Sequence, residues 1–363
     1  MQSLQHVGLS LRHGLFRLHR RFGAARTMAD AADKVWTIAP AETLNTPPSV
    51  FLPGEFDKVR TVEGRTTTEI EAKRAHGGSF ERPPIMAYRY ANAFLYKSTV
   101  VACGAERRVL PYGVSPPPSH QFPVVSIREG ALAGSYLGLQ YFGHWLKDDA
   151  PLSLLAEQYG QPVSPSPPTW HAAHFAESHV HSYVKFLGLP WRQEENVYFK
   201  SLVMFDDEDF TTHKSARLEI LRQRALKRLG APHKKRRVFI KRGISDKGPR
   251  RFHNEDAVAA ALAEDGFDIL DPSKASVEEI VQMLNGCDIV VGSEGSHLIH
   301  ALYFLPPGAG LLAISAPNRF TTVNKRWTDL LNIQYGFTVG DAEEEGFSAN
   351  IDDVKRTIDL FGL

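Results

Sequence analysis

Small residues separate an apolar run from a helical pattern late in the chain, and this spacing suits an anion-binding turn. Gly292, Ser293, Gly295 and Ser296 follow the apolar run 289–291, and apolar residues at helical spacing come next. Such a turn lets a ligand approach the backbone, and the N–H groups and positive dipole end of the following helix point toward it. The turn suits a diphosphate, whereas its spacing matches neither a dinucleotide fingerprint nor a P-loop. Tight packing alone also produces such turns, so both interpretations stay open at this point.

A histidine and two carboxylates form a second candidate group. His144, Asp148 and Asp149 precede Pro151, which suits the first turn of a helix capped by Asp149. A histidine beside a carboxylate can act as a general base, because the carboxylate fixes the tautomer of the imidazole. The alternative is structural: the two aspartates cap the helix while His144 packs. The spacing alone favours this structural interpretation.

Arginines follow a predicted strand at 237–241. Arg242 lies at the carboxyl end of this strand, and Arg250 and Arg251 lie on the loop after it. Guanidinium groups bind phosphates through paired hydrogen bonds. The alternative is a basic surface loop, but the placement at a strand end favours a phosphate site.

The elements that position these residues alternate between strand and helix in the second half, which predicts a parallel, doubly wound sheet. The predicted strands are 237–241, 267–270, 288–291 and 310–314, and the predicted helices are 255–265, 276–285 and 297–305. Asn254 caps the first helix, and Ser276 with Glu279 forms a capping box for the second. Ligands bind beyond the carboxyl ends of strands in such sheets, so the arginines and the glycine turn should share one crevice.

The first half is less regular. Residues 31–84 are punctuated by prolines and glycines, which predicts a wrapping segment with few strong elements. Strands are predicted at 93–101, 108–110, 124–127 and 197–205, with a stiff connection at 115–120 and a helix at 176–187. A long amphipathic helix at 213–229 is predicted to bridge the two halves.

Composition excludes several classes of protein. Of 363 residues, 43% are hydrophobic and 23% are charged, and the net charge is +1, so the chain is predicted to be globular and soluble, without a nucleic-acid partner. Two distant cysteines, Cys103 and Cys287, form no disulfide framework, which fits a reducing compartment. The sequence contains no zinc-type spacing of cysteines and histidines and no apolar run long enough to span a membrane.

Two charged segments have competing interpretations. Residues 1–29 contain no acidic residue and carry a basic amphipathic pattern. A solvated tail is favoured there, and a membrane-surface helix or an organelle-targeting peptide are the alternatives. The acidic run Asp206–Asp209 superficially offers a metal site, although a solvated surface run is favoured. A phosphoryl-transfer enzyme that uses these acids is therefore one rival hypothesis.

Several fragments resemble glycosyltransferase family 61 in the right order, over about residues 120–340. They are G-H-W-L-x-D at 143–148, R-x-x-N-E at 251–255, and V-V-G-x-x-G-[AS]-x-L…F-x-P-P-G at 290–308. The resemblance implies a GT-B-like α/β fold: two Rossmann-like domains face a cleft, and the C-terminal one is doubly wound with a parallel sheet. It also implies an inverting, metal-independent transferase.

Residue roles follow from the resemblance together with the strand-end positions. Candidate bases are His144, Asp148 and Glu294, ranked in that order. Candidate donor- and diphosphate-binding residues are Arg242, Arg251, Asn254, Glu255, Gly292, Ser293, Gly295, Ser296, His297 and His300. The chain departs from the family pattern where Glu294 replaces a histidine, His297 replaces a glycine and His300 replaces a common asparagine.

The predicted activity is transfer of a sugar from a nucleoside-diphosphate sugar to a hydroxyl of a glycan or glycolipid, in polysaccharide synthesis, without a cofactor. The alternative is a non-catalytic protein that binds sugar nucleotides or glycans through the same fold. The expected location is cytoplasmic, with the basic helix as a candidate peripheral contact at the inner face of the membrane.

The predicted domains follow the same scheme. They are a basic tail at 1–30, an acceptor-side domain at 31–210, a bridging helix and linker at 211–235, a nucleotide-sugar domain at 236–340, and a C-terminal helix at 341–363 that packs back.

Overall fold

The computed structural model describes residues 27–103, 105–110, 124–166, 179–230, 236–242, 248 and 250–363. The predicted tail 1–30, apart from 27–30, and the connection 115–120 lie outside the described residues. The chain divides into two compact units. Unit 1 holds the residues up to Ala41 and Pro83–Glu208, and unit 2 holds Glu42–Arg82 and Asp209–Leu363. The expected contiguous domain 31–210 thus contains a segment that belongs to unit 2.

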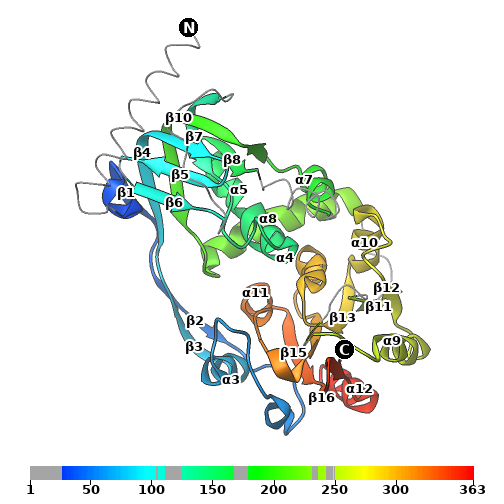
Figure 1. The fold of residues 1–363 in the computed structure, drawn as a ribbon. Helices are drawn as coiled ribbons and strands as arrows, with labels where there is room; N and C mark the ends of the chain where they lie inside the picture. The colour runs from blue at the N-terminus through cyan, green and yellow to red at the C-terminus, as the bar shows by residue number, and fades with distance from the viewer. Residues whose placement is uncertain are drawn as a thin grey trace. The chain divides into compact units, whose positions relative to one another are not determined.

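Unit 1 is built on one mixed sheet with the strand order β6-β5-β4-β10-β7-β8-β9, and β1 pairs with β4. The long strand β10 runs antiparallel to β4 and parallel to β7 (Figure 1). The strands are β1 (Lys34–Ala39), β4 (Ile85–Tyr96), β5 (Thr99–Ala102), β6 (Ala105–Arg108), β7 (Val125–Leu132), β8 (Gln161–Pro165), β9 (Arg192–Glu194) and β10 (Asn196–Asp206). The β10-β7-β8-β9 half is parallel and the other half antiparallel, so the sheet departs from the expected Rossmann-like pattern.

The helices described in unit 1 follow the strands. They are α2 (Met28–Ala31), α4 (Phe142–His144), the π-helical turn η2 (Trp145–Asp149), α5 (Ala150–Glu157) and α7 (Val180–Leu187). Helices α4, η2 and α5 follow one another without a break, and α5 packs on β7 and β8.

Unit 2 contains a five-stranded sheet with the order β12-β11-β13-β14-β15, and every pairing in it is parallel. The strands are β11 (Arg236–Ile240), β12 (Asp268–Leu270), β13 (Cys287–Ser293), β14 (Gly310–Ser315) and β15 (Gln334–Val339). The predicted strands of the second half agree with these bounds to within two residues. The expected doubly wound parallel sheet is therefore present in unit 2.

Helices cover this sheet because successive side chains of a strand point to opposite faces. Phe239, Val291 and Ile314 share one core with α9 (Glu255–Glu264) and α12 (Ile351–Asp359), which lie together in Figure 1. Helix α10 (Val277–Leu284) and α8 (Thr212–Leu229) both pack against η3 (Ser296–Tyr303). Further elements of unit 2 are α11 (Lys325–Leu330), η4 (Pro317–Arg319), and the hairpin β16 (Asp341–Glu343) with β17 (Gly346–Ser348).

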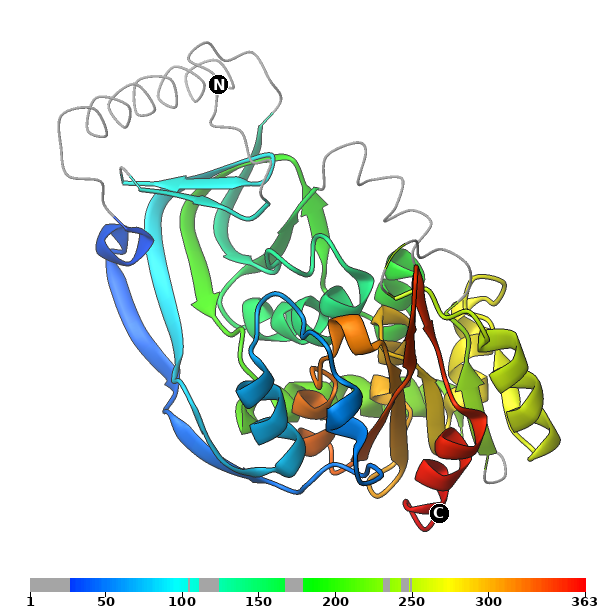
Figure 2. The same ribbon diagram turned by 60° about the horizontal axis from the view of Figure 1, so that its bottom comes forward.

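The prediction that residues 31–84 hold few regular elements was wrong. Within unit 2, the segment forms β2 (Glu42–Thr46), η1 (Glu55–Lys58), α3 (Thr68–His76) and β3 (Gly78–Arg82), and β2 pairs with β3. Figure 2 shows η1 and α3, coloured blue, side by side. Helix α3 is mostly polar, so its apolar periodicity is weak, and Thr67 caps it by accepting from the N–H of Ile70 at 3.3 Å.

Two buried glutamates connect residues 42–82 to the rest of unit 2 through hydrogen bonds. Glu71 accepts hydrogen bonds from the N–H and hydroxyl of Thr322, at 2.5 and 2.6 Å, and pairs with Arg74 at 2.8 Å. Glu55 likewise accepts from the N–H of Val339 and pairs with Lys58. Both carboxylates are almost fully buried, so each is the partner of a backbone N–H group that water does not reach.

Replacing Glu71 with alanine is expected to lower the free energy of unfolding of unit 2 by about 3 kcal/mol. The change leaves the Thr322 N–H group and the Arg74 guanidinium without their buried acceptor. Urea unfolding followed by tryptophan fluorescence measures the difference. The control is Glu81→Ala, since Glu81 is exposed on β3. Equal stability of the two variants would contradict the role assigned to Glu71.

Candidate active site

The strand order of unit 2 determines where a ligand should bind. From the pair β11 and β13, the chain winds outward in opposite directions, to β12 on one side and to β14 and β15 on the other. In such sheets the ligand crevice lies beyond the carboxyl ends of the two central strands. Arg242 follows β11, and the turn from Gly292 to His297 follows β13, with Ile240 and Gly292 in register. The structure therefore brings Arg242 and the glycine turn to the switch point of the sheet.

Arg242 lies directly against the glycine turn. Its backbone N–H donates to Glu255 Oε1 at 2.7 Å, and its Nη1 donates to the carbonyl oxygen of Glu294 at 2.5 Å. A Cβ atom added to Gly295 would lie 2.9 Å from Arg242 Nη1. A side chain at position 295 would therefore displace the end of the Arg242 side chain. Glu255, a predicted donor-binding residue, thus holds the backbone that carries Arg242.

His297 adds a neutral, buried nitrogen to the same place. The ring donates to the backbone carbonyl of Ser293, while Nε2 is buried and has no hydrogen-bond partner among the described residues. The residue as a whole keeps some exposure, but Nε2 does not face solvent. Burial lowers the pKa of His297 well below its usual range, and the charges of Arg242, His300 and Arg250 lower it further. The imidazole is therefore neutral at pH 7 and sits among three basic side chains.

The lowered pKa of His297 predicts a loss of stability in acid. Below the ordinary pKa of 6.5, the unfolded chain binds a proton that the folded chain does not, until pH reaches the lower folded-state pKa. Stability should therefore fall as pH drops from 6.5, by up to about 1.4 kcal/mol per pH unit. His297→Gln should remove this slope. Unfolding free energies at pH 7.5 and 5.5 measure it, and an unchanged slope in the variant would contradict the assignment.

Glu294 is an ion-pair partner in this cluster. Its Oε2 lies 3.2 Å from Arg319 Nη1 and 4.0 Å from Arg250 Nη1. Two guanidinium groups therefore face one carboxylate whose side chain is 10% exposed. This arrangement suits a residue that holds arginines at the turn better than one that takes a proton from an acceptor.

Other predicted residues are placed differently. Arg251 points to Glu345 at 4.0 Å and is 54% exposed, so the structure does not bring it to the turn. The side chain of Asn254 exchanges two hydrogen bonds with the backbone of Ala349, at 2.8 and 2.9 Å, and makes no capping bond to α9. Asn254 therefore occupies the N-cap position of α9, but its side chain holds the backbone just after β17.

The helix after the turn is a 3-10 helix, η3, and not the predicted α-helix. Side chains at positions i and i+3 eclipse in this geometry, which places His297 and His300 on the same side. Gly292 is packed, because a Cβ there would lie 2.6 Å from the carbonyl oxygen of Ile240. The hydroxyl of Ser293 is buried without a partner among the described residues, whereas Ser296 is exposed.

In unit 1, three side chains of one helical segment form a compact charged group. His144 Nδ1 lies 2.9 Å from Asp148 Oδ2, and Lys147 Nζ lies 2.6 Å from the same oxygen. Lys147 Nζ is also 3.0 Å from His144 Nδ1, so the consistent assignment has both Nδ1–H and the ammonium donating to Asp148. Nε2 of His144 then carries the lone pair. The side chain of Lys147 is 6% exposed, so its charge acts in a partly dry environment.

Comparison with known proteins identifies the segment that contains both groups. A family model described as Glycosyltransferase 61 matches residues 142–312. This match covers slightly less than half of the chain and shows that the segment is similar to glycosyltransferase family 61. The match begins two residues before His144 and includes Arg242 and the whole glycine turn, so the predicted resemblance is confirmed. The similarity to this family suggests that the protein is a glycosyltransferase.

Other comparisons add little. No curated protein matches the chain. One similar solved structure is a mutant flavo di-iron protein from Thermotoga maritima, at 10% identity and a TM-score of 0.28. That likeness covers 60% of this chain and 51% of the other, so the match spans about half of that protein. At this TM-score it carries no argument.

Sequence reasoning missed two contributors to the glycosyltransferase 61 segment and its surroundings. Lys147 was overlooked because a helix start was expected at residue 150. The segment instead continues through a π-helical turn, where the N–H of Ala150 donates to the carbonyl of Trp145, five residues back. Asp149 does not cap a helix, and its carboxylate accepts from the N–H of Ser135 at 3.1 Å.

Arg319 is the second missed residue. It lies four residues after β14, and so beyond the carboxyl end of a strand, as Arg242 lies two residues beyond the end of β11. Applying the strand-end criterion to every predicted strand would have found it.

Only two of the four residues in the acidic run Asp206–Asp209 are exposed to solvent. Asp206 and Glu208 have side chains 52% and 79% exposed, but Asp207 is buried and Asp209 pairs with Arg82 and Arg326. Across the described part of the chain, no three or more His, Cys, Asp or Glu side chains gather as a metal ion would need. No helix in that part is both long and apolar enough to cross a membrane.

Proposed function

We propose that this glycosyltransferase 61 protein is an inverting enzyme that moves a sugar from a nucleoside-diphosphate sugar to a hydroxyl of a glycan or glycolipid. The observation that carries the proposal is the contact between Arg242 and Gly295 at the switch point of the parallel sheet. A guanidinium group that lies against a glycine turn at the start of a helix can bind a diphosphate, and Ser296 of this turn is exposed.

The chemistry of the leaving group supports a metal-independent mechanism. Negative charge builds on the diphosphate as the bond to the sugar breaks. Arg242, Arg250 and Arg319 would stabilise it by fixed positive charge, which is the role that a divalent ion has in other transferases. Glu294 would keep Arg250 and Arg319 in position when the donor is absent. The neutral imidazole of His297 would contribute a polar contact without repelling these arginines.

Inversion requires a base that removes the acceptor proton while the hydroxyl attacks the anomeric carbon from the face opposite the diphosphate. We assign this role to His144, with Asp148 fixing its tautomer and Lys147 fixing Asp148. A GT-B arrangement of the two units, a role in polysaccharide synthesis, a cytoplasmic location and a membrane contact of residues 1–30 complete the proposal.

A donor screen tests the proposal. UDP-, GDP- and CMP-sugars are added to the full chain in a thermal-shift assay, and a donor at 100 times its dissociation constant should stabilise by about 2.7 kcal/mol. The donor that shifts the transition is then incubated with glycan acceptors, with and without EDTA. Transfer that EDTA leaves unchanged and that inverts the anomeric centre is expected. Donor binding without hydrolysis or transfer to any acceptor would instead indicate a sugar-nucleotide-binding protein.

A further inference from the structure

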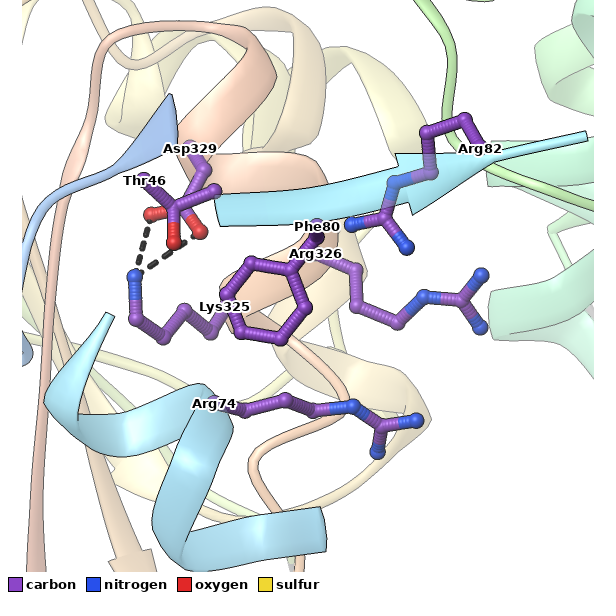
Figure 3. Close-up of a pocket in the computed structure, with 7 residues that line it drawn as sticks. All are labelled: Thr46, Arg74, Phe80, Arg82, Lys325, Arg326 and Asp329. Carbon is purple, nitrogen blue, oxygen red and sulfur yellow. Dashed lines mark hydrogen bonds and ion pairs between the residues drawn. The ribbon is translucent and has the colours of Figure 1, made fainter. Parts of the chain in front are cut away.

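A second basic pocket lies in unit 2, at the end of the β2–β3 ribbon. Four cationic side chains line it: Arg74 from α3, Arg82 from β3, and Lys325 and Arg326 from α11. Figure 3 shows the guanidinium groups of the three arginines projecting to the same side of the Phe80 ring. None of these residues takes part in the glycine-turn site. The pocket therefore needs an explanation of its own.

Several polar atoms of the residues that line this pocket are buried and have no hydrogen-bond partner among the described residues. They are the Nε atoms of Arg82 and Arg326 and the hydroxyl oxygen of Thr46. The side chain of Arg82 is 13% exposed, so water does not readily satisfy its Nε–H group. Each unsatisfied buried donor costs about 1–3 kcal/mol. Two such donors in one pocket indicate that a partner with acceptor atoms belongs there.

The residues that line the pocket carry more positive than negative charge. Lys325 Nζ donates to both carboxylate oxygens of Asp329, at 2.7 and 2.8 Å, and to the carbonyl oxygen of Pro47 at 2.6 Å. Its ammonium group points away from the three guanidinium groups in Figure 3. Lys325 and Asp329 therefore neutralise each other, and the three arginines determine what the pocket can hold.

Two carboxylates face the three arginines. Asp209 bonds to Arg326 and lies 3.4 Å from Arg82 Nη1, and Glu71 pairs with Arg74. Burial lowers the pKa of Arg82, Asp209 raises it, and the charges of Arg326 and Arg74 lower it further. The three guanidinium groups are thus within electrostatic reach of one another. One anion would balance their remaining positive charge.

We propose that this pocket binds a phosphate group. Three guanidinium groups on one side offer donors to a tetrahedral anion with several acceptor oxygens, whereas a carboxylate has only two. The side chains of Arg74 and Arg326 are partly exposed, so an anion can reach their guanidinium groups from solvent. The phosphate would come either from inorganic phosphate or from a monoester whose remainder stays at the mouth of the pocket.

Arginine labelling of the wild-type full chain tests this proposal. Because it needs no substitution, a folding defect cannot confuse the result. Phenylglyoxal modifies guanidinium groups, and peptide mass spectrometry gives the rate at each arginine. Arg74 and Arg326, whose side chains are 27% and 24% exposed, should be labelled about tenfold more slowly at a phosphate concentration ten times the dissociation constant. Arg356, which is 65% exposed on α12, serves as the internal control and should show no protection. Potassium chloride at equal ionic strength corrects for screening.

Two ligand arms distinguish the source. Protection by inorganic phosphate alone supports a site for the free ion, and stronger protection by glycerol 3-phosphate supports a monoester site. No protection by either ligand, or equal protection by chloride, would overturn the proposal.

Variants separate this pocket from the proposed donor site. Arg82→Gln and Arg326→Gln should abolish the phosphate-dependent thermal shift while keeping the shift produced by the donor, and Arg242→Gln should do the reverse. Arg356→Gln should keep both shifts. If Arg242→Gln removes the phosphate effect and Arg326→Gln leaves it intact, phosphate binds at the glycine turn and the second pocket is refuted. If no sugar nucleotide shifts the transition of the wild-type protein while phosphate does, the proposed function is refuted and the pocket stands.

Discussion

Replacing Arg242 with methionine is expected to reduce glycosyl transfer by about 10²–10³-fold, which is the usual cost of removing one fixed group that stabilises developing negative charge. The guanidinium group bonds to the Glu294 carbonyl and lies against Gly295, so the substitution removes a cation that contacts the glycine turn directly. Both kcat and donor affinity should fall, because the diphosphate is charged before and after the sugar leaves. Steady-state kinetics with the donor found in the screen measure the loss.

Arg251→Met is the matched control for this prediction. Arg251 was expected from the sequence to bind the donor, but it extends toward Glu345 on the β16–β17 hairpin. We expect this variant to keep activity within a few fold of wild type. If Arg251→Met proves as damaging as Arg242→Met, the switch-point site described for unit 2 does not bind the diphosphate in this way.

Replacing His144 with glutamine is expected to slow turnover by about 10²–10⁴-fold while donor binding is kept, because a general base contributes this much to proton removal. Glutamine has no basic nitrogen, although it retains polar atoms near Asp148 Oδ2 and Lys147 Nζ. The prediction concerns kcat, and the thermal shift with donor should remain that of the wild type. Single-turnover rates, measured with saturating acceptor, separate the chemical step from product release.

His181→Gln provides the control in the same unit. His181 is exposed on α7 and contacts the ring of Trp191, so its loss should leave the rate unchanged. Full turnover by His144→Gln would remove His144 from the mechanism, and Asp148→Asn would then be the next variant to measure. A loss of folding in either variant would appear as a lower thermal midpoint in the absence of donor.

The parallel sheet of unit 2 was predictable because its signals are local. Each strand from β11 to β14 is a short apolar run, and the capping box of Ser276 and Glu279 formed as expected, with the Glu279 N–H donating to Ser276 Oγ at 3.2 Å. The segment 42–82 was not predictable in the same way. One of its buried hydrogen bonds joins Glu71 to Thr322, 251 residues apart, and such a contact leaves no periodic pattern in the sequence.

The site residues show a similar division. The strand ends placed Arg242 and the glycine turn together, because the carboxyl ends of parallel strands share one edge. The choice between Arg250 and Arg251 depended on tertiary structure, since the Arg251 carbonyl accepts from Phe347 of β17 and Phe252 stacks on the same phenylalanine at 4.8 Å. Lys147 depended on an irregular helical turn. Positions along a strand can therefore be inferred from sequence more securely than the direction of a side chain in a loop.

The division of unit 2 into two separate stretches of sequence determines how it can be produced alone. A fragment that begins at Asp209 would lack Glu55 and Glu71, and the backbone groups of Val339 and Thr322 would lose their buried acceptors. The side chains at the ends of the two stretches nevertheless lie close together, since Arg82 Nη1 is 3.4 Å from Asp209 Oδ1. A recombinant chain that starts at Glu42 and joins Arg82 to Asp209 through a few residues, each spanning about 3.3–3.6 Å, restores the missing stretch. Such a spliced protein would carry the glycine turn and the basic pocket without His144, so sugar-nucleotide affinity could be measured apart from proton transfer.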